Sequence, residues 1–357
     1  MMENSILKEY HAVAAKRALL IIVFVLLTVT VAILSCAVGT HTSFFDAYQI
    51  ILDHLLGAEY PLRSPEWWND FYIFDGILPC VVMSIIAGAG LALGGTVMQS
   101  MMGNPLADPY TTGISSGACL GAVSALIVGF SFSSIAGEYG IISSSFVCAL
   151  IPAIVVILIT KYVNSSPSTM ILVGTAISYF FNAVVTLLMI STDSDTLHSA
   201  FLWQIGSVSG STWSDIPVMF LTVLIASILV QLVSNKLNIM ALGDNSAKSL
   251  GLDVGKFRVI CLILLSVLTA AIISYTGIIG FIGLISPHLA RFLIGGDNKF
   301  VVPLSMAVGA FTLVFADALS RSLLSYTEIP VGVVMSFIGA PVFLYMVMRQ
   351  KSDKEVF

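Results

Sequence analysis

The stretch Leu19–Gly39 reads LLIIVFVLLTVTVAILSCAVG and contains no charged residue. An α-helix crosses the hydrocarbon core of a bilayer in about 20 residues, so this stretch is long enough to span a membrane. Lys16 and Arg17 precede it and Cys36 lies near its end, which faintly resembles a lipoprotein processing site. Because the apolar run is longer than the core of a signal peptide, we interpret it as a retained first helix.

The whole chain shares this apolar character. Hydrophobic residues make up 57% of its 357 residues and charged residues only 10%, against about 25% in an ordinary soluble domain. A soluble fold of this size needs more charged surface, so most of the surface is expected to face lipid. The net charge is −5, and no basic face suited to nucleic acid is visible.

Apolar runs of helical length recur along the chain, without the short alternating segments of a membrane barrel. The sequence therefore predicts an all-α integral membrane protein with one transmembrane domain over residues 1–357. A span over 279–294 would be short enough to be partly re-entrant. The ten predicted spans are 19–39, 77–101, 113–132, 141–160, 169–190, 216–234, 257–275, 279–294, 301–322 and 331–348.

The distribution of Lys and Arg orients these spans. With the N-terminus in the cytoplasm, 13 of the 15 Lys and Arg residues fall inside, and only Arg63 and Arg321 fall outside. Positive charge gathers on the cytoplasmic side of membrane proteins, so both termini are predicted to be cytoplasmic. Segment 40–76 is then a solvated acidic external loop with anchoring aromatic residues, and segment 236–256 is the longest cytoplasmic loop.

The cytoplasmic segment between the second and third spans reads GNPLADP over 103–109. Asn104 before Pro105 can start a single helical turn, as a cap followed by proline at the first helical position. Asp108 before Pro109 is pushed out of the α region and ends that turn. The segment is therefore predicted to form a stiff cytoplasmic corner.

The longest cytoplasmic loop contains LGDNSAKSLGL over 242–252. Asp244 can cap a short helix whose apolar side includes Ala247 and Leu250, and Gly251 can close it. So short a helix is unstable alone in water and needs a surface to pack on. That surface belongs either to a partner protein or to the chain's own bundle.

A third irregular segment reads GIIGFIG over 277–283 and is followed by SPHLAR. Glycines at this density predict a broken helix, and broken helices at membrane depth line cavities. We interpret His288 as an interfacial histidine and predict no metal site, since no second ligand lies at suitable spacing. Asp317 is the only acid that we place inside a span, and Arg321 follows at the spacing of a local ion pair.

Catalytic motifs are absent from the sequence. The stretch GLDVGKF over 251–257 is one residue short of a phosphate-binding loop and has Phe257 in place of the required Ser or Thr. No metalloprotease or serine-hydrolase motif and no pair of catalytic carboxylates occurs. We therefore predict that the chain is not an enzyme and binds no cofactor. Its five cysteines are widely spaced and predicted to be buried.

Several stretches together resemble the FecCD family of ABC permeases, which includes importers of cobalamin, haem and iron–siderophore complexes. They run in family order between Ala87 and Arg349 and read GNPLADPYTTGISSGACLGA, LGDNSAKSLGLDV, GIIGFIGLISPHLARFLIGGDNKFVVP, ADALSR and EIPVGVVMSFIGAPVFLYMVMR. The resemblance implies a permease of the cell membrane that forms a homodimer around one central path. It also implies two ABC ATPase subunits, which bind ATP and Mg²⁺, and an extracytoplasmic binding protein.

The resemblance also implies roles for particular residues. An ATPase-coupling helix would involve Leu242, Gly243, Asp244, Ala247, Leu250 and Gly251. A cytoplasmic gate would involve Asn104, Leu106, Ser166 and Ser168. Binding-protein docking would involve Arg321 and, outside the family pattern, Arg63.

One departure from the family concerns docking. Many members begin the second span with Arg-x-Pro-Arg, whereas this chain has Ile77, Leu78, Pro79 and Cys80. Both arginines are absent, so the family's docking pattern transfers only in part.

The cargo that the family implies is a metal chelate, with an iron–siderophore complex expected and cobalamin, haem or molybdate as alternatives. The alternative from another class is an ion-coupled secondary transporter. Such a protein normally carries several ionisable residues at mid-membrane, and here only Asp317 comes close.

Overall fold

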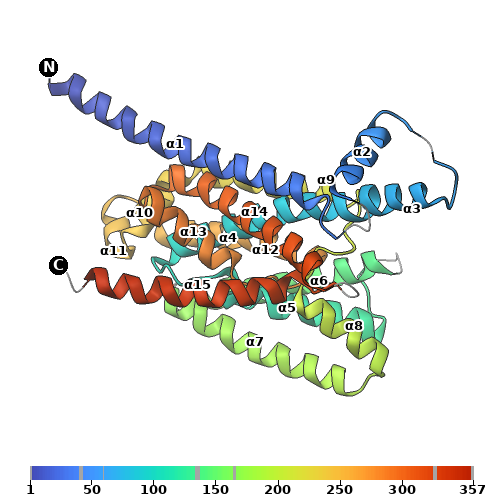
Figure 1. The fold of residues 1–357 in the computed structure, drawn as a ribbon. Coiled ribbons are helices and arrows are strands. Elements are labelled where there is room, and N and C mark those ends of the chain that lie inside the picture. The colour runs from blue at the N-terminus through green and yellow to red at the C-terminus, as the bar shows by residue number, and fades with distance from the viewer. Residues whose placement is uncertain are drawn as a thin grey trace.

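A computed structural model describes residues 2–39, 43–58, 60–132, 137–163, 166–324 and 328–354, and every regular element in these ranges is helical. The long helices lie side by side in one bundle (Figure 1). Their bounds are α1 Met2–Ser35, α2 Phe44–Leu55, α3 Pro65–Phe71, η1 Tyr72–Ile77, α4 Leu78–Met102, η2 Pro109–Thr112, α5 Ile114–Val128, α6 Glu138–Tyr162, α7 Pro167–Ile190, α8 Ser194–Ile205, α9 Ile216–Leu232, α10 Ser234–Ala241, α11 Asp244–Ser249, α12 Val254–Thr276, α13 Ile282–Ile294, α14 Asn298–Leu323 and α15 Val331–Lys354.

Each of the ten predicted spans coincides with one helix. Among the described residues, six helices can cross a membrane by length and composition, the α9–α10 pair bent by 63° would be a seventh, and three shorter helices are apolar. Six, one and three make ten, although the number of actual crossings stays a prediction. The start of α1 and the end of α15 lie at the same end of the bundle as α10 and α11, opposite α2, α3 and α8 (Figure 1).

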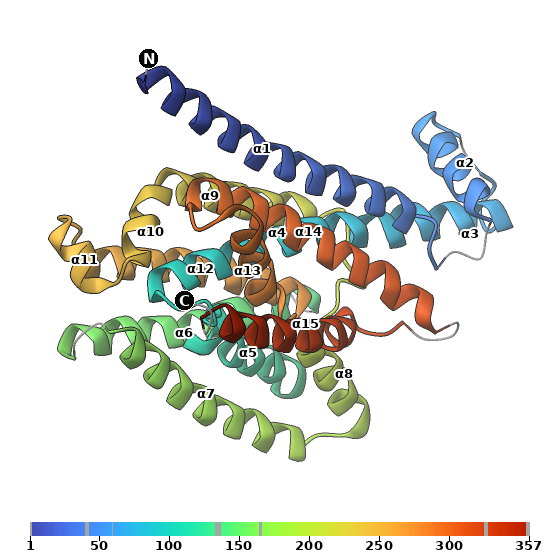
Figure 2. The ribbon, with the colours of Figure 1, turned by 60° about the vertical axis from the view of Figure 1, so that its left-hand side comes forward.

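Helix α4 forms the centre of the bundle and is buried along almost its whole length. A side chain at Gly88 would collide with the backbone of Gly309 in α14, and one at Gly95 would collide with Gly283 in α13. Small residues thus let the backbones of these helices approach each other. Helices α1 and α7 lie at opposite edges (Figure 2), where only 11% and 17% of their apolar windows are buried, against 72% for the helix that contains α4.

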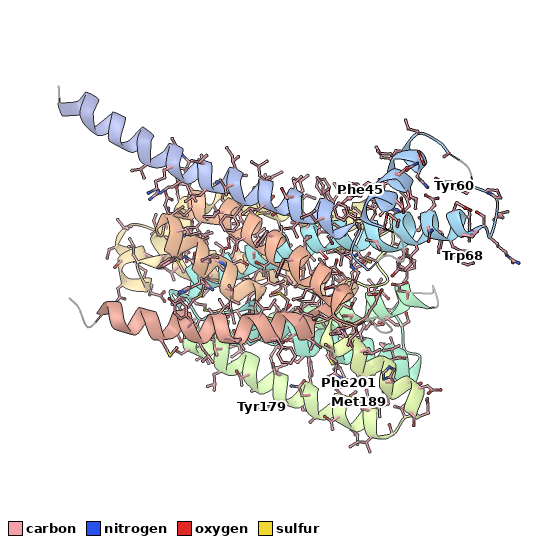
Figure 3. All side chains as sticks on the ribbon, viewed as in Figure 1. Phe45, Tyr60, Trp68, Tyr179, Met189 and Phe201 are labelled. Atoms are coloured by element: carbon pink, nitrogen blue, oxygen red, sulfur yellow. The ribbon has the colours of Figure 1, made fainter. Side chains whose placement is uncertain are left out.

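The segment predicted as a solvated loop over 40–76 is largely helical. Ser43 caps α2, and Ser64 caps α3 directly before Pro65, because a hydroxyl satisfies the first free backbone N–H groups of a helix. A π-helical turn, η1, then continues from α3 into α4. Aromatic side chains of this segment, among them Phe45, Tyr60 and Trp68, gather at one end of the molecule (Figure 3).

The broken helix predicted around 277–283 is confirmed. Helix α12 ends at Thr276, and α13 begins at Ile282. Gly277 has φ 65° and Phe281 has φ 69°, and Gly277 is the residue type that tolerates this conformation. The break opens one end of the bundle beside α8, a helix that the sequence did not predict because it is short and half polar.

Candidate coupling, gate and outer sites

The predicted coupling segment forms the short helix α11 between two left-handed glycines. Gly243 has φ 90° and Gly251 has φ 83°, so glycine is required on both sides. Gly251 ends the segment as predicted. Asp253 then caps α12, where the Lys256 backbone N–H donates to its carboxylate at 3.2 Å. This hydrogen bond holds the pKa of Asp253 below its usual value.

The prediction that Asp244 caps this helix is wrong. Gly243 occupies the cap position, and no side chain accepts a capping hydrogen bond there. The Asp244 carboxylate instead accepts two hydrogen bonds from the Arg258 guanidinium, at 2.6 and 3.2 Å. The Arg258 side chain is only 1% exposed. A buried guanidinium needs a carboxylate partner, and a bidentate charged pair is stronger than a single cap bond.

The apolar residues of the coupling segment divide into two groups. Ala247 is fully buried against the chain's own helices, whereas Leu242 and Leu250, on either side of α11, are 62% and 60% exposed. Of the two packing surfaces considered for this helix, its own bundle therefore receives Ala247 and Asp244. The two leucines remain available to another protein.

The cytoplasmic corner is a single turn that Asn104 starts, as predicted, and the Ala107 N–H donates to the Asn104 carbonyl at 3.1 Å. The Leu106 backbone N–H donates to the Asn104 side-chain oxygen at 2.9 Å, and Leu106 itself is exposed. This hydrogen bond is the cap that asparagine provides at the start of a turn. Asp108 is extended as predicted, with φ −129° and ψ 142°, and it also caps η2 by accepting from the Tyr110 N–H at 2.7 Å.

After the corner the chain turns back into the bundle. Asp108 is buried and lies with Leu91 and Gly283 around one small packing defect. The Tyr110 hydroxyl donates to the Ile279 carbonyl at 2.9 Å. Because Leu91 lies near the middle of α4, Asp108 lies deep between the helices. Asp108 lies outside the spanning helices, so Asp317 stays the only acid inside a predicted span, and Asp108 is a further acid that the fold buries between helices.

The other predicted gate residues lie at the start of α7. Ser166 caps this helix by accepting from the Thr169 N–H at 3.2 Å, and Ser168 is exposed. Helix α7 packs on η2 where Gly174 meets the backbone of Thr112. Within the described part of the chain, no hydrogen bond joins Ser166 or Ser168 to Asn104 or Leu106.

A buried polar network, which the sequence did not predict, connects the coupling region with the corner. Arg291 of α13 donates to Gln99 and, at 2.9 Å, to Ser100, both near the end of α4. Ser100 donates to Asn298 at 3.0 Å, and the Asn298 N–H donates to the Asn238 side chain of α10 at 2.7 Å. Residues far apart in sequence thus join α10, which leads into α11, to the end of α4, which leads into the corner.

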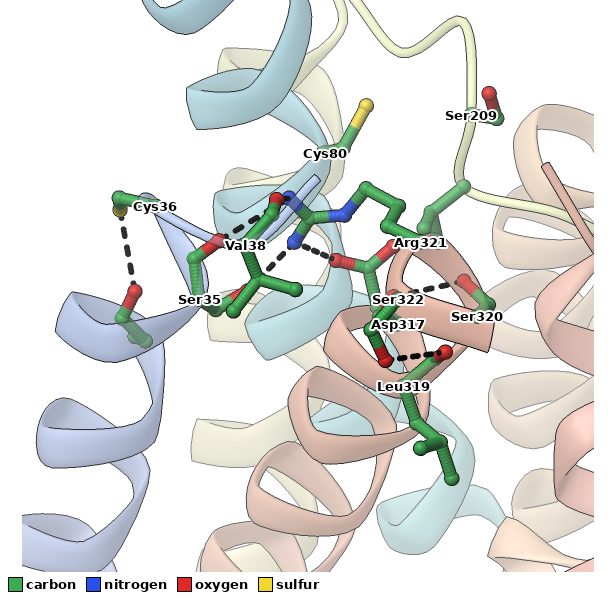
Figure 4. Close-up of polar contacts among 12 residues, drawn as sticks. Ser35, Cys36, Val38, Cys80, Ser209, Asp317, Leu319, Ser320, Arg321 and Ser322 are labelled. Carbon is green, nitrogen blue, oxygen red and sulfur yellow. Dashed lines mark hydrogen bonds and ion pairs between the residues drawn. The ribbon is translucent and has the colours of Figure 1, made fainter. Parts of the chain in front are cut away.

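The predicted ion pair at the outer end of α14 is confirmed. Arg321 donates to Asp317 at 2.7 Å, and both side chains are buried. The same guanidinium donates to the Ser35 carbonyl at 3.1 Å, the Ser35 hydroxyl at 2.6 Å and the Val38 carbonyl at 2.9 Å (Figure 4). Arg321 therefore ties α14 to the end of α1. Arg63, by contrast, is exposed in a turn.

Two cavities lie at this end of the bundle. The larger, of about 470 Å³, is bounded by the start of α6, by α8 and by the α12–α13 break. The smaller, of about 180 Å³, lies between the start of α4 and the end of α14. Both are lined by Ser207, Ser209 and Glu328, and the Ser209 hydroxyl donates to the Glu328 carboxylate. The Ser209–Glu328 contact thus lies where the two cavities adjoin.

The five cysteines are free and buried, as predicted. Cys80 and Ile77 are both buried at the start of α4, at the two positions where many family members carry arginine. Within the described ranges, no three His, Cys, Asp or Glu side chains come together as a metal site.

Comparison with known proteins matches this chain to one family of transport proteins. The model of the FecCD transport family matches residues 19–349. The Fe(3+)-citrate import system permease protein YfmE of Bacillus subtilis is 32% identical over 93% of this chain and 95% of its own length. The hemin transport system permease protein HmuU of Yersinia pestis is 34% identical over 78% of this chain and 83% of its own length.

The fold also matches a solved structure. A metal-chelate type ABC transporter in an inward-facing conformation superposes with a TM-score of 0.79 at 30% identity, over 92% of this chain and 98% of that one.

Proposed function

From the premise that this chain belongs to the FecCD transport family and is the multi-pass cell-membrane permease of a metal-chelate type ABC importer, we propose that its cargo is an iron–siderophore complex. Relatives named for iron–citrate and iron–hydroxamate import support an iron chelate. Because other relatives are named for the import of hemin, cobalamin and molybdate, these three are the alternative cargoes.

The proposed assembly is a homodimer with two separate ABC ATPase subunits and an extracytoplasmic binding protein. ATP and Mg²⁺ bind to the ATPase subunits, because this chain has no phosphate-binding loop. The exposed apolar side chains of α7, such as Leu172, Tyr179 and Leu187, offer a face on which a second copy can pack (Figure 3).

The observation that carries the ATPase partnership is the exposure of Leu242 and Leu250. The Asp244–Arg258 ion pair and the buried Ala247 anchor α11 on the helices of its own chain. Leu242 and Leu250 are therefore held in place while their side chains stay exposed. A groove on the ATPase that receives them would gain about 2 kcal/mol from each buried leucine. In this proposal Asn104, Leu106, Ser166 and Ser168 close the cytoplasmic end of the path.

For docking of the binding protein, the proposal separates the two predicted arginines. Arg63 is exposed and available to a carboxylate of the binding protein. Arg321 already donates to Asp317, Ser35 and Val38, and we assign it the structural role of fixing the ends of α1 and α14 rather than a contact with the binding protein.

Transport by the reconstituted complex tests the function. We expect ATP-dependent uptake of an iron–siderophore complex into proteoliposomes that contain the permease and its ATPase, with the binding protein added outside. Cobalamin, haem and molybdate are the comparison cargoes. Uptake that proceeds without the ATPase and follows an imposed proton gradient would instead identify a secondary transporter.

Thiol labelling tests the proposed topology. A cysteine in place of Leu62, which is 82% exposed, should react with an impermeant reagent added outside intact cells. One in place of Ser246, which is also exposed, should react only after the membrane is opened. The buried native cysteines provide a low background. Labelling of Ser246→Cys in intact cells contradicts the ten-span topology.

A further inference from the structure

The larger cavity has an unbalanced charge. Among the described residues that line it, Glu138 and Glu328 carry negative charge, and none is Lys, Arg or His. Both glutamates are exposed, and neither forms an ion pair with a described residue. The segments 133–136 and 325–327, next to them in sequence, contain no charged residue. No cation from these segments therefore balances the two carboxylates.

The rest of the lining suits an organic chelate without changing this charge. Hydroxyl groups of Ser199, Tyr275 and Thr276 can donate or accept hydrogen bonds, and Leu202 and Trp203 give an apolar wall. A cavity of about 470 Å³ lies within the range of small-molecule sites.

The adjoining smaller cavity also has more acidic than basic residues in its lining. Its charged lining residues are Asp75, Asp317, Arg321 and Glu328. Arg321 and Asp317 neutralise each other at 2.7 Å, which leaves Asp75 and Glu328 uncompensated among the described lining residues. Among the described lining residues of the two cavities, the one guanidinium, that of Arg321, donates to Asp317 and to the end of α1 (Figure 4).

We propose that the 470 Å³ cavity binds neutral or cationic metal chelates and rejects anionic ones, with Glu138 and Glu328 as the residues that determine this selectivity. The proposal rests on the metal-chelate function and narrows it. An anionic chelate must enter the negative potential of the two glutamates, whereas a cationic chelate is attracted by it.

The experiment uses the full-length permease in nanodiscs and three iron complexes of different charge. Ferrioxamine B is cationic, ferrichrome is neutral and ferric citrate is anionic. Trp203 is the tryptophan that lines the cavity, so quenching of tryptophan fluorescence that is lost in Trp203→Phe reports occupancy of this cavity by bound iron. We expect ferrioxamine B and ferrichrome to bind at least about tenfold more tightly than ferric citrate, with a larger difference at low ionic strength.

The informative variant is the double substitution Glu138→Gln and Glu328→Gln. Both residues are exposed, so their replacement should leave the thermal unfolding of the permease unchanged. The difference between ferrioxamine B and ferric citrate should shrink by about tenfold. The matched control is Glu66→Gln, which removes an exposed carboxylate of α3 outside both cavities and should leave the difference intact.

Three results would overturn the proposal. These are equal affinity for the three complexes, an unchanged charge preference in the double variant, and no binding of any complex. The iron–siderophore assignment can fail while the charge proposal holds. A cobalamin importer, for example, would still bind neutral or cationic complexes more tightly than anionic ones in this assay, but the reconstituted complex would transport only cobalamin.

Discussion

The coupling segment and the outer end of α14 each contain an arginine–aspartate pair, and the two pairs leave different surfaces behind. Arg258 holds Asp244 at 2.6 Å and Arg321 holds Asp317 at 2.7 Å. Around Asp244, the pair anchors the helix and leaves Leu250 exposed. At the outer end of α14, Arg321 is the arginine that the family resemblance assigns to docking, and its guanidinium is already paired with Asp317.

A residue in a docking motif can therefore bind a partner protein only if its side chain is not already bonded within its own chain. The cytoplasmic contact is expected to be apolar and firmly supported, and the outer contact to depend on weaker exposed charges such as Arg63. Four variants test this comparison.

The largest effect is expected from Leu250→Asp. An aspartate forced into an apolar groove would be buried without a partner, at a cost of several kcal/mol. Co-purification with the ATPase, and with it uptake, should be abolished while membrane insertion stays normal. Leu250→Met is the control and should keep both. Normal co-purification of Leu250→Asp would move the ATPase contact elsewhere, first to the Asn104–Asp108 corner.

Arg321→Met should come next, because it leaves the buried Asp317 carboxylate without its cation, which costs about 3–5 kcal/mol. We expect a lower thermal unfolding temperature but unchanged affinity for the binding protein in the folded fraction. The double variant with Asp317→Leu should recover most of the stability. Full stability together with weakened docking would show that Arg321 contacts the binding protein directly.

Asp244→Asn should have a smaller effect, since Asp244 is 37% exposed. Loss of charged hydrogen bonds to the buried Arg258 should cost about 2 kcal/mol, which is more than the roughly 1 kcal/mol of a lost helix cap. Unfolding of the purified variant and the fraction of ATPase retained measure this. A double-mutant cycle with Arg258→Met should show coupling, and additive effects would argue against the pair.

The smallest effect is expected from Arg63→Gln. An exposed charge at the edge of an interface contributes less than about 1 kcal/mol and acts mainly on the association rate. Association with the binding protein should slow, and its dependence on salt should become weaker. Lys256→Gln, an exposed cation beside the coupling segment, is the control at the other end. An identical salt dependence for wild type and Arg63→Gln would remove Arg63 from the docking surface.

Local sequence accounts for the class of the protein, the positions of the ten apolar helices and several of their ends. These follow from local properties: the length of apolar runs and the glycines that interrupt or end helices, such as Gly251 and Gly277. Each depends on residues within a few positions of one another, so a single sequence contains the information.

Tertiary structure decided where the polar groups pair. Asp244 looks like a cap when only its neighbours along the chain are considered, and only the packing of α11 on α12 brings Arg258 to it. Asp108 lies in a loop by sequence, yet the chain's return into the bundle buries it beside Gly283. Glu138 and Glu328 meet at one cavity although 190 positions separate them. A buried charge selects its partner by distance in space, and that distance exists only once the helices have packed.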